Sequence, residues 1–155
     1  MSHVFTSLRH PLERILEAEY FLGQLAKSNG LEFQFQLNAF LSASRSVTFV
    51  LQKSLNNTAG LKDWHGPQQE SMKADPSMRF FLELRNISQK EGPVSYVGGA
   101  RIDGGWTYRF AGSREAVPKE LLGRDICDCC AEQIVKLAKM LLSYSRCFPF
   151  DACPA

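Results

Sequence analysis

Four long stretches of the chain carry apolar residues at helical spacing, which predicts a mostly helical protein. The first helix is expected over residues 11–28, because Pro11 suits a first helical turn and Asn29-Gly30 is a stop signal. The second helix is expected over residues 31–55. Its apolar residues occupy most of its circumference, so we expect it to be buried at the centre of a bundle.

A third helical stretch follows a predicted loop over residues 56–67 and begins by about Gln68. Asp75-Pro76 either kinks this helix or restarts it, because proline disfavours helix at the residue before it. The apolar pattern is helical again up to Lys90, and Gly92-Pro93 ends it.

Between Val94 and Gly112 the spacing of apolar residues changes to two, which predicts a β-hairpin that turns at Asp103-Gly104-Gly105. A lone hairpin is marginally stable in water, so its aromatic side chains should pack on the helices. A last helix is expected to start between Pro118 and Asp125 and to run to about Arg146.

These elements predict an all-α fold class. We expect a four-helix up-and-down bundle with one β-hairpin inserted at about 94–112, before the last helix. The 155 residues, 45% of them hydrophobic, suffice for one core, so a single domain over residues 1–155 is expected. A net charge of +2 is too low for a disordered chain and does not by itself indicate a nucleic-acid or membrane partner.

The sequence has no apolar run long enough for a membrane span, and its first ten residues lack the apolar run of a secretory signal. All five cysteines follow residue 126, whereas a disulfide framework would distribute them along the chain. We therefore expect a cytoplasmic protein that does not bind membranes.

The cysteines are the first candidate for chemistry. Residues 127–130 contain a C-x-x-C spacing near a helix start, where thiolates are stabilised. A redox pair of this kind normally follows a strand in a βαβ unit, and a zinc site needs about four ligands. Neither context is present, so we interpret Cys130 as a core residue and the others, Cys147 and Cys153 included, as free thiols. No metal and no cofactor are expected.

The three histidines give no catalytic pattern, because no serine or cysteine nucleophile can be paired with His3, His10 or His65. The paired glycines at 98–99 and 104–105 belong to the hairpin and do not form a phosphate-binding loop.

Two arginines are the more informative residues. Arg85 is expected beside Met78, Phe81 and Leu82 on its helix, so its charge must be paired, hydrogen-bonded or held at an interface. On the second helix a polar stripe, which recurs every seven residues, crosses an otherwise apolar helix. It consists of Asn38, Arg45 and Gln52.

Two interpretations of these arginines remain open. In one, Arg45 and Arg85 pair with acids such as Glu17, Glu19 or Glu83 and hold the bundle in register. In the other, the arginines line a cleft for an anion, such as a phosphate backbone. Residues 73–114 contain seven Lys or Arg and four Asp or Glu, a local charge of +3 that favours an anionic partner.

Two segments resemble the HEPN superfamily, small helical-bundle proteins of bacterial defence and toxin systems. They are Phe40–Thr48, similar to the second helix of such proteins, and Leu84–Lys90, similar to their signature segment. The resemblance implies a homodimer whose two signature segments face each other across an RNA-binding cleft. Arg85 and Asn86 match the signature, but Lys90 stands where active ribonucleases have a histidine, and a solvated lysine does not exchange protons near neutral pH.

The resemblance therefore implies a non-catalytic, homodimeric RNA-binding protein, or a toxin-antitoxin or defence-associated component with a cognate partner protein. Its nucleic-acid contacts would be Arg85, Asn86, Lys90 and Arg45. One alternative is a metal-independent ribonuclease in which Lys90 or His65 replaces the missing histidine. Another is a structural helical dimer without a ligand site.

Overall fold

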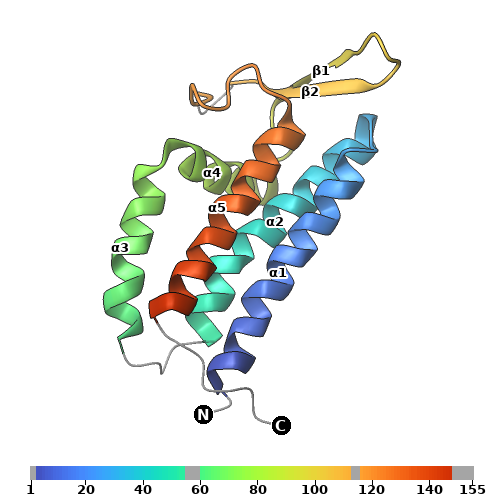
Figure 1. Cartoon of the computed structure of the whole chain (residues 1–155). Helices are drawn as coiled ribbons and strands as arrows, with labels where there is room; N and C mark the ends of the chain where they lie inside the picture. The colour runs from blue at the N-terminus through green and yellow to red at the C-terminus, as the bar shows by residue number, and fades with distance from the viewer. Residues whose placement is uncertain (1–2, 55–59, 113–115, 148–155) are drawn as a thin grey trace.

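The computed structural model describes residues 3–54, 60–112 and 116–147. Within these ranges the chain forms five helices and one two-stranded antiparallel sheet (Figure 1), which confirms the predicted helical fold with a hairpin before the last helix. The elements are α1 (His3–Leu25), α2 (Gly30–Ser54), α3 (Leu61–Ala74), α4 (Pro76–Lys90), β1 (Tyr96–Ala100), β2 (Trp106–Phe110) and α5 (Ile126–Cys147).

The first helix differs from its predicted bounds. It begins at His3, so Pro11 lies inside α1 and not in its first turn. The side chain of Pro11 is buried against the bundle. A proline inside a helix removes one backbone hydrogen bond, which costs stability. At Pro11 the burial of the ring offsets part of that cost.

Helix α2 occupies the centre of the bundle, as its apolar sequence predicted. It contacts α1, α4 and α5 (Figure 1), and its inward residues are almost fully buried. They are Phe33, Leu37, Phe40, Leu41, Val47 and Leu51. The inward face of α2 is thus buried within a single chain, whereas Leu31, Phe35 and Phe49 on its outer face remain exposed.

At Asp75 one helix ends and a new helix begins, so of the two predicted alternatives the structure has the restart and not the kink. It has an extended backbone conformation, ends α3 and caps α4, and its Oδ1 accepts from the amides of Ser77 and Met78 at 3.0 and 3.1 Å. Its Oδ2 accepts from Nζ of Lys136 on α5 at 2.8 Å. Asp75 therefore joins three helices at one corner.

The third helix begins earlier than predicted. Gly60 has a φ of 79°, and α3 starts at Leu61, so Pro67 lies within α3 and not in a loop. His65 on this helix is buried, and its Nε2 lies 2.7 Å from Nε2 of Gln52 on α2. This contact ties α3 to the centre of the bundle.

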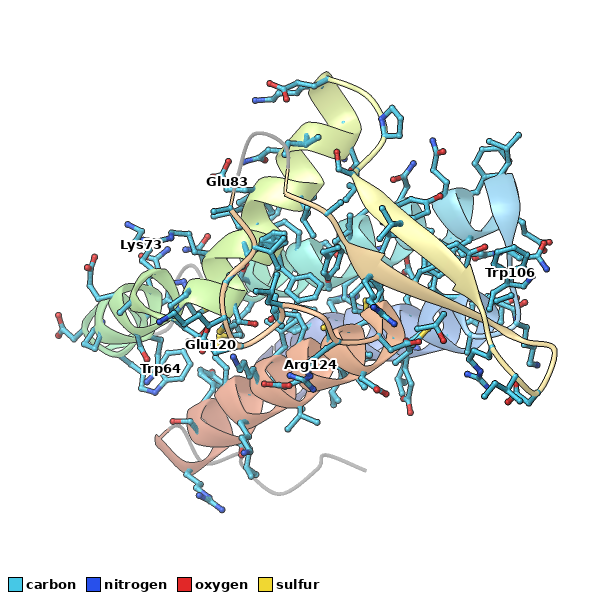
Figure 2. The ribbon with its side chains drawn as sticks, turned by 90° about the horizontal axis from the view of Figure 1, so that it is seen from above. Trp64, Lys73, Glu83, Trp106, Glu120 and Arg124 are labelled. Carbon is cyan, nitrogen blue, oxygen red and sulfur yellow. The ribbon has the colours of Figure 1, made fainter. Side chains whose placement is uncertain are left out.

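The hairpin packs on the helices through its aromatic residues, as predicted. The Tyr108 ring stacks on Phe33 of α2 with centroids 3.8 Å apart, and Phe110 makes edge contacts with Phe80 and Phe81 of α4. The Tyr108 hydroxyl also accepts from the backbone N–H of Gly30, at the start of α2. The hairpin thereby closes the end of the bundle that Figure 2 views from above.

The last helix starts at Ile126, just after the predicted range, because the preceding residues form turns. Among the helices that the structure describes, none is long and apolar enough to cross a membrane.

We predict that Asp75→Ala lowers the free energy of unfolding by about 1–2 kcal/mol at pH 7, the usual effect of losing an N-cap plus a partly buried ion pair. Although burial opposes ionisation, the hydrogen bond from Lys136 and those from the two backbone amides hold the pKa of Asp75 below its ordinary 3.8. Its contribution is therefore complete above that pH and is lost as the pH falls through the lower, folded-state value. Urea unfolding at several pH values measures this. Lys136→Met, which leaves the cap intact, should cost less, and a loss that does not shrink in acid would contradict the account.

A second prediction concerns His65. Burial lowers the pKa of His65 from its ordinary 6.5, so the unfolded chain binds this proton more readily than the folded one. Stability should therefore decrease as the pH falls below 6.5, and His65→Gln should remove part of that decrease. Denaturant unfolding at pH 7.5 and 5.5 tests this, with His10→Gln, at an exposed position on α1, as the control. Equal pH dependence in the wild type and in His65→Gln would show that the interpretation is wrong.

Candidate functional site

A partly open pocket with a volume of about 150 Å³ lies between α2, α3, α4 and α5. Four helices build it, and α2 supplies its largest group of polar residues. Its lining consists of Ser44, Arg45, Thr48, Phe49, Gln52, Gln69, Met72, Lys73, Met78, Arg79, Phe81, Leu82, Gln133 and Leu137.

The lining is cationic and otherwise uncharged. It includes Arg45, Lys73 and Arg79, and none of its residues is an aspartate or a glutamate. Lys73 has an exposed, long contact of 3.8 Å with Glu70, a pair that contributes little in water. Figure 2 shows Lys73 on the side of the molecule opposite to Trp106 of the hairpin. The pocket is therefore suited to an anion.

Arg45 is the innermost of these cations. Its Nη1 donates to the hydroxyl of Thr48 at 2.9 Å, and its Cζ lies 4.1 Å from the centroid of the Phe49 ring. Burial, and after it the positive charge of Arg85, lower the pKa of Arg45 from its ordinary value. The guanidinium remains charged at neutral pH, but in surroundings that disfavour the charge.

Arg85 on α4 approaches Arg45 closely enough for the two charges to oppose each other. Its Nε is buried and has no hydrogen-bond partner in the parts of the chain that the structure describes. Within those parts, neither arginine forms a salt bridge with a carboxylate. Two guanidinium groups thus share one region without a protein anion between them.

Two amides add unsatisfied acceptors nearby. Oε1 of Gln133, whose residue lines the pocket from α5, and Oδ1 of Asn38, on the polar stripe of α2, are buried without a partner among the described residues. A buried polar atom without a hydrogen bond is costly, so both atoms call for a ligand or ordered water.

The structure separates the four residues predicted to contact nucleic acid. Arg45 lines the pocket, whereas Arg85 does not line it and acts on Arg45 through its charge. Asn86 is half-buried and Lys90 is exposed at the last position of α4, and neither lines the pocket.

Within the described ranges, neither Arg45 nor Arg85 forms the ion pairs with Glu17, Glu19 or Glu83 that the first interpretation expected. Glu17 pairs with Arg14 on its own helix, and no salt bridge within the described ranges joins Glu19 or Glu83 to either arginine. The reason is positional, because α1 contributes no residue to the pocket and Glu83 lies on the outer side of α4 in Figure 2.

Sequence reasoning missed Phe49, Gln133 and the α3 side of the pocket, which come together only through tertiary packing. A signal for Gln133 was available. It lies between Cys130 and Leu137 in the buried stripe of α5, where a polar residue interrupts an apolar series. A polar residue at such a position is a candidate for a site.

The cysteines at the start of α5 do not form a reactive centre. Burial, followed by the charge of Asp125, raises the pKa of the Cys127 thiol to about 12, and burial raises that of Cys129 to about 11. Cys130 is fully buried, and its pKa is raised as well. Burial thus outweighs the helix start that was expected to stabilise a thiolate. These three thiols are free, Cys147 ends α5, and Cys153 lies outside the described residues.

The described ranges contain no group of three or more His, Cys, Asp or Glu side chains that could hold a metal ion.

Comparison with known proteins gives one curated relative, protein ea47 of Escherichia phage lambda. It is 34% identical over 70 residues, which are 44% of this chain and 17% of that protein. The chain thus matches less than a fifth of the relative's length. No solved structure matches the chain.

The resemblance to the HEPN superfamily is wrong. The sequence profile that matches is that of bacteriophage lambda protein ea47, over residues 21–136, which include both segments that carried the resemblance. A short Arg-Asn pair on a helix is too small a pattern to identify a family, and the association with toxin and defence systems depended on it. The profile covers most of the chain, which therefore belongs to the family of bacteriophage lambda protein ea47.

Proposed function

We propose that this protein binds RNA without cleaving it, through the pocket between α2, α3, α4 and α5. The observation that carries the proposal is the pair Arg45 and Arg85, two partly buried guanidinium groups with no carboxylate partner among the described residues. Two neighbouring positive charges repel each other, so an external anion between them would stabilise both.

Phosphate fits this arrangement. Guanidinium groups bind phosphate oxygens in pairs, and the geometry adds specificity to the charge. Lys73 and Arg79 at the pocket would add further positive charge around a phosphate held at Arg45. The buried Oε1 of Gln133 would accept from a donor group of the same ligand.

The rest of the lining suits an unpaired base. Phe49, Met72, Met78, Phe81, Leu82 and Leu137 are apolar, and the guanidinium of Arg45 already lies over the Phe49 ring. Single-stranded nucleic acids bind proteins through a positively charged groove combined with stacking of bases on aromatic or guanidinium planes. The pocket combines both features.

A polar track leads away from the pocket along α4. Arg79, Asn86 and Lys90 recur at helical spacing on its outer side, with Glu83 as the one acid among them. From Arg79 to Lys90 the track extends about 16 Å at 1.5 Å per residue. That length favours a polymeric ligand over a single free phosphate.

The absence of catalysis is part of the proposal, and it is supported by the residue types at the pocket. Its lining consists of Arg, Lys, Gln, Ser, Thr, Met, Leu and Phe side chains, none of which exchanges protons near neutral pH. His65 contacts Gln52 but does not line the pocket, and Lys90 lies at the far end of α4. A cytoplasmic location, where thiols stay reduced, also belongs to the proposal.

We predict that Arg45→Gln and Arg85→Gln each weaken RNA binding by about 1–3 kcal/mol, the usual contribution of a charge-assisted contact. Fluorescence anisotropy with a labelled single-stranded RNA measures this. Binding should weaken steeply with added salt, and each substitution should reduce the slope of log K against log salt by about 0.7.

The control is Arg109→Gln on β2, which removes the same charge from an exposed position on the hairpin. It should bind RNA nearly as well as the wild type. Absence of RNA binding at low salt, or an equal loss in Arg109→Gln, would contradict the proposal. RNA cleaved by the wild type but left intact by Arg45→Gln would contradict its non-catalytic part.

A further inference from the structure

Helix α5 carries an exposed apolar stripe that the bundle leaves uncovered. Val135 and Leu142 expose 49% and 50% of their surfaces, and Ala131 and Ala138 are exposed as well. The four positions follow one another in steps of four, three and four residues, which places them in one line along the helix. This α5 stripe lies opposite the buried side of the helix and is not part of the pocket.

The α5 stripe is complementary to itself when two copies run antiparallel. A twofold axis between positions 136 and 137 brings Ala131 opposite Leu142 of the other copy, and Val135 opposite Ala138. A small residue thus meets a large one in every pair. Alternation of this kind lets two helices approach closely and interdigitate.

The charges at the two ends of the α5 stripe follow the same symmetry. Asp128 lies in the first turn of α5 and Arg146 in the last, and no salt bridge within the described residues involves either of them. The twofold axis that pairs the apolar residues brings Asp128 of one copy to the turn that carries Arg146 of the other. A parallel arrangement would instead bring like charges together.

One helical stripe is too small for a stable interface, which needs about 1,000 Å² in total. The neighbouring helix offers more apolar surface, because α1 packs beside α5 (Figure 1) and exposes a residue every four positions. Leu12, Leu16 and Tyr20 expose 46%, 59% and 62% of their surfaces. These residues add exposed apolar side chains on the neighbouring helix to those of the α5 stripe.

We propose that this chain forms a homodimer through α5, with the two α5 helices antiparallel and α1 of each copy at the margin. The inference does not depend on RNA binding, because the pocket and the α5 stripe share no residue. It also places the dimer contact on α5 and not on α2.

The first test is the mass in solution, measured by multi-angle light scattering at about 50 μM. The wild type should have twice the 17.4 kDa mass of the chain. Val135→Glu should be monomeric, or have a dimer dissociation constant at least tenfold higher. Phe35→Glu, at a position on α2 that is 60% exposed, is the matched control and should remain dimeric. Circular dichroism verifies that each variant is folded.

The second test determines the orientation of the helices. Asp128→Arg or Arg146→Asp alone should weaken the dimer at least tenfold, because each places like charges opposite each other, and the double variant should restore it. A monomeric wild type would overturn the proposal, and so would a dimer that Val135→Glu leaves intact. A dimer that Val135→Glu disrupts, but that neither charge reversal affects, would overturn the antiparallel arrangement.

Discussion

The packing of α2 against α1, α4 and α5 determines where the polar residues of the bundle lie. Because of this packing, its polar stripe of Asn38, Arg45 and Gln52 is half-buried beside other helices. The side-chain amide of Gln52 hydrogen-bonds to His65 of α3, whereas the charge of Arg45 is opposed by the guanidinium group of Arg85. The packing that stabilises the fold therefore creates a cationic region that no carboxylate in the described ranges neutralises.

The break at Asp75 gives this region its shape. Since Asp75 ends α3 with its extended backbone, and its carboxylate caps α4 and binds Lys136, the two helices change direction at a fixed corner. Helix α3 lies along the side of the bundle in Figure 1. Met72 and Lys73, just before the corner, and Met78 and Arg79, just after it, then line the same pocket. A continuous helix could not bring residues from both sides of the corner around one cavity.

The sequence predicted those features of the fold that depend on the spacing of apolar and polar residues along the chain. The central position of α2, the hairpin with its packed aromatic side and the polar stripe all follow from the spacing of residue types. The start of α1 before Pro11, and the course of α3 through Pro67, were missed because a proline in a helical pattern predicts a helix boundary, whereas both helices continue through it. The pocket itself could not be predicted, since Gln133 joins Arg45 only through tertiary packing. The Arg85-Asn86 pair pointed to the wrong family because its pattern is short.

We propose that Arg45 and Arg85 destabilise the free protein and that an external anion compensates their charges. Thermal unfolding of the wild type and of Arg45→Met, each with and without single-stranded RNA, tests it most directly. Methionine keeps the apolar stem but removes the charge, so without RNA the melting temperature of Arg45→Met should equal or exceed that of the wild type. RNA should raise the melting temperature of the wild type alone. A decrease of several degrees in Arg45→Met without RNA, with no response of the wild type to RNA, would show instead that Arg45 is a structural residue.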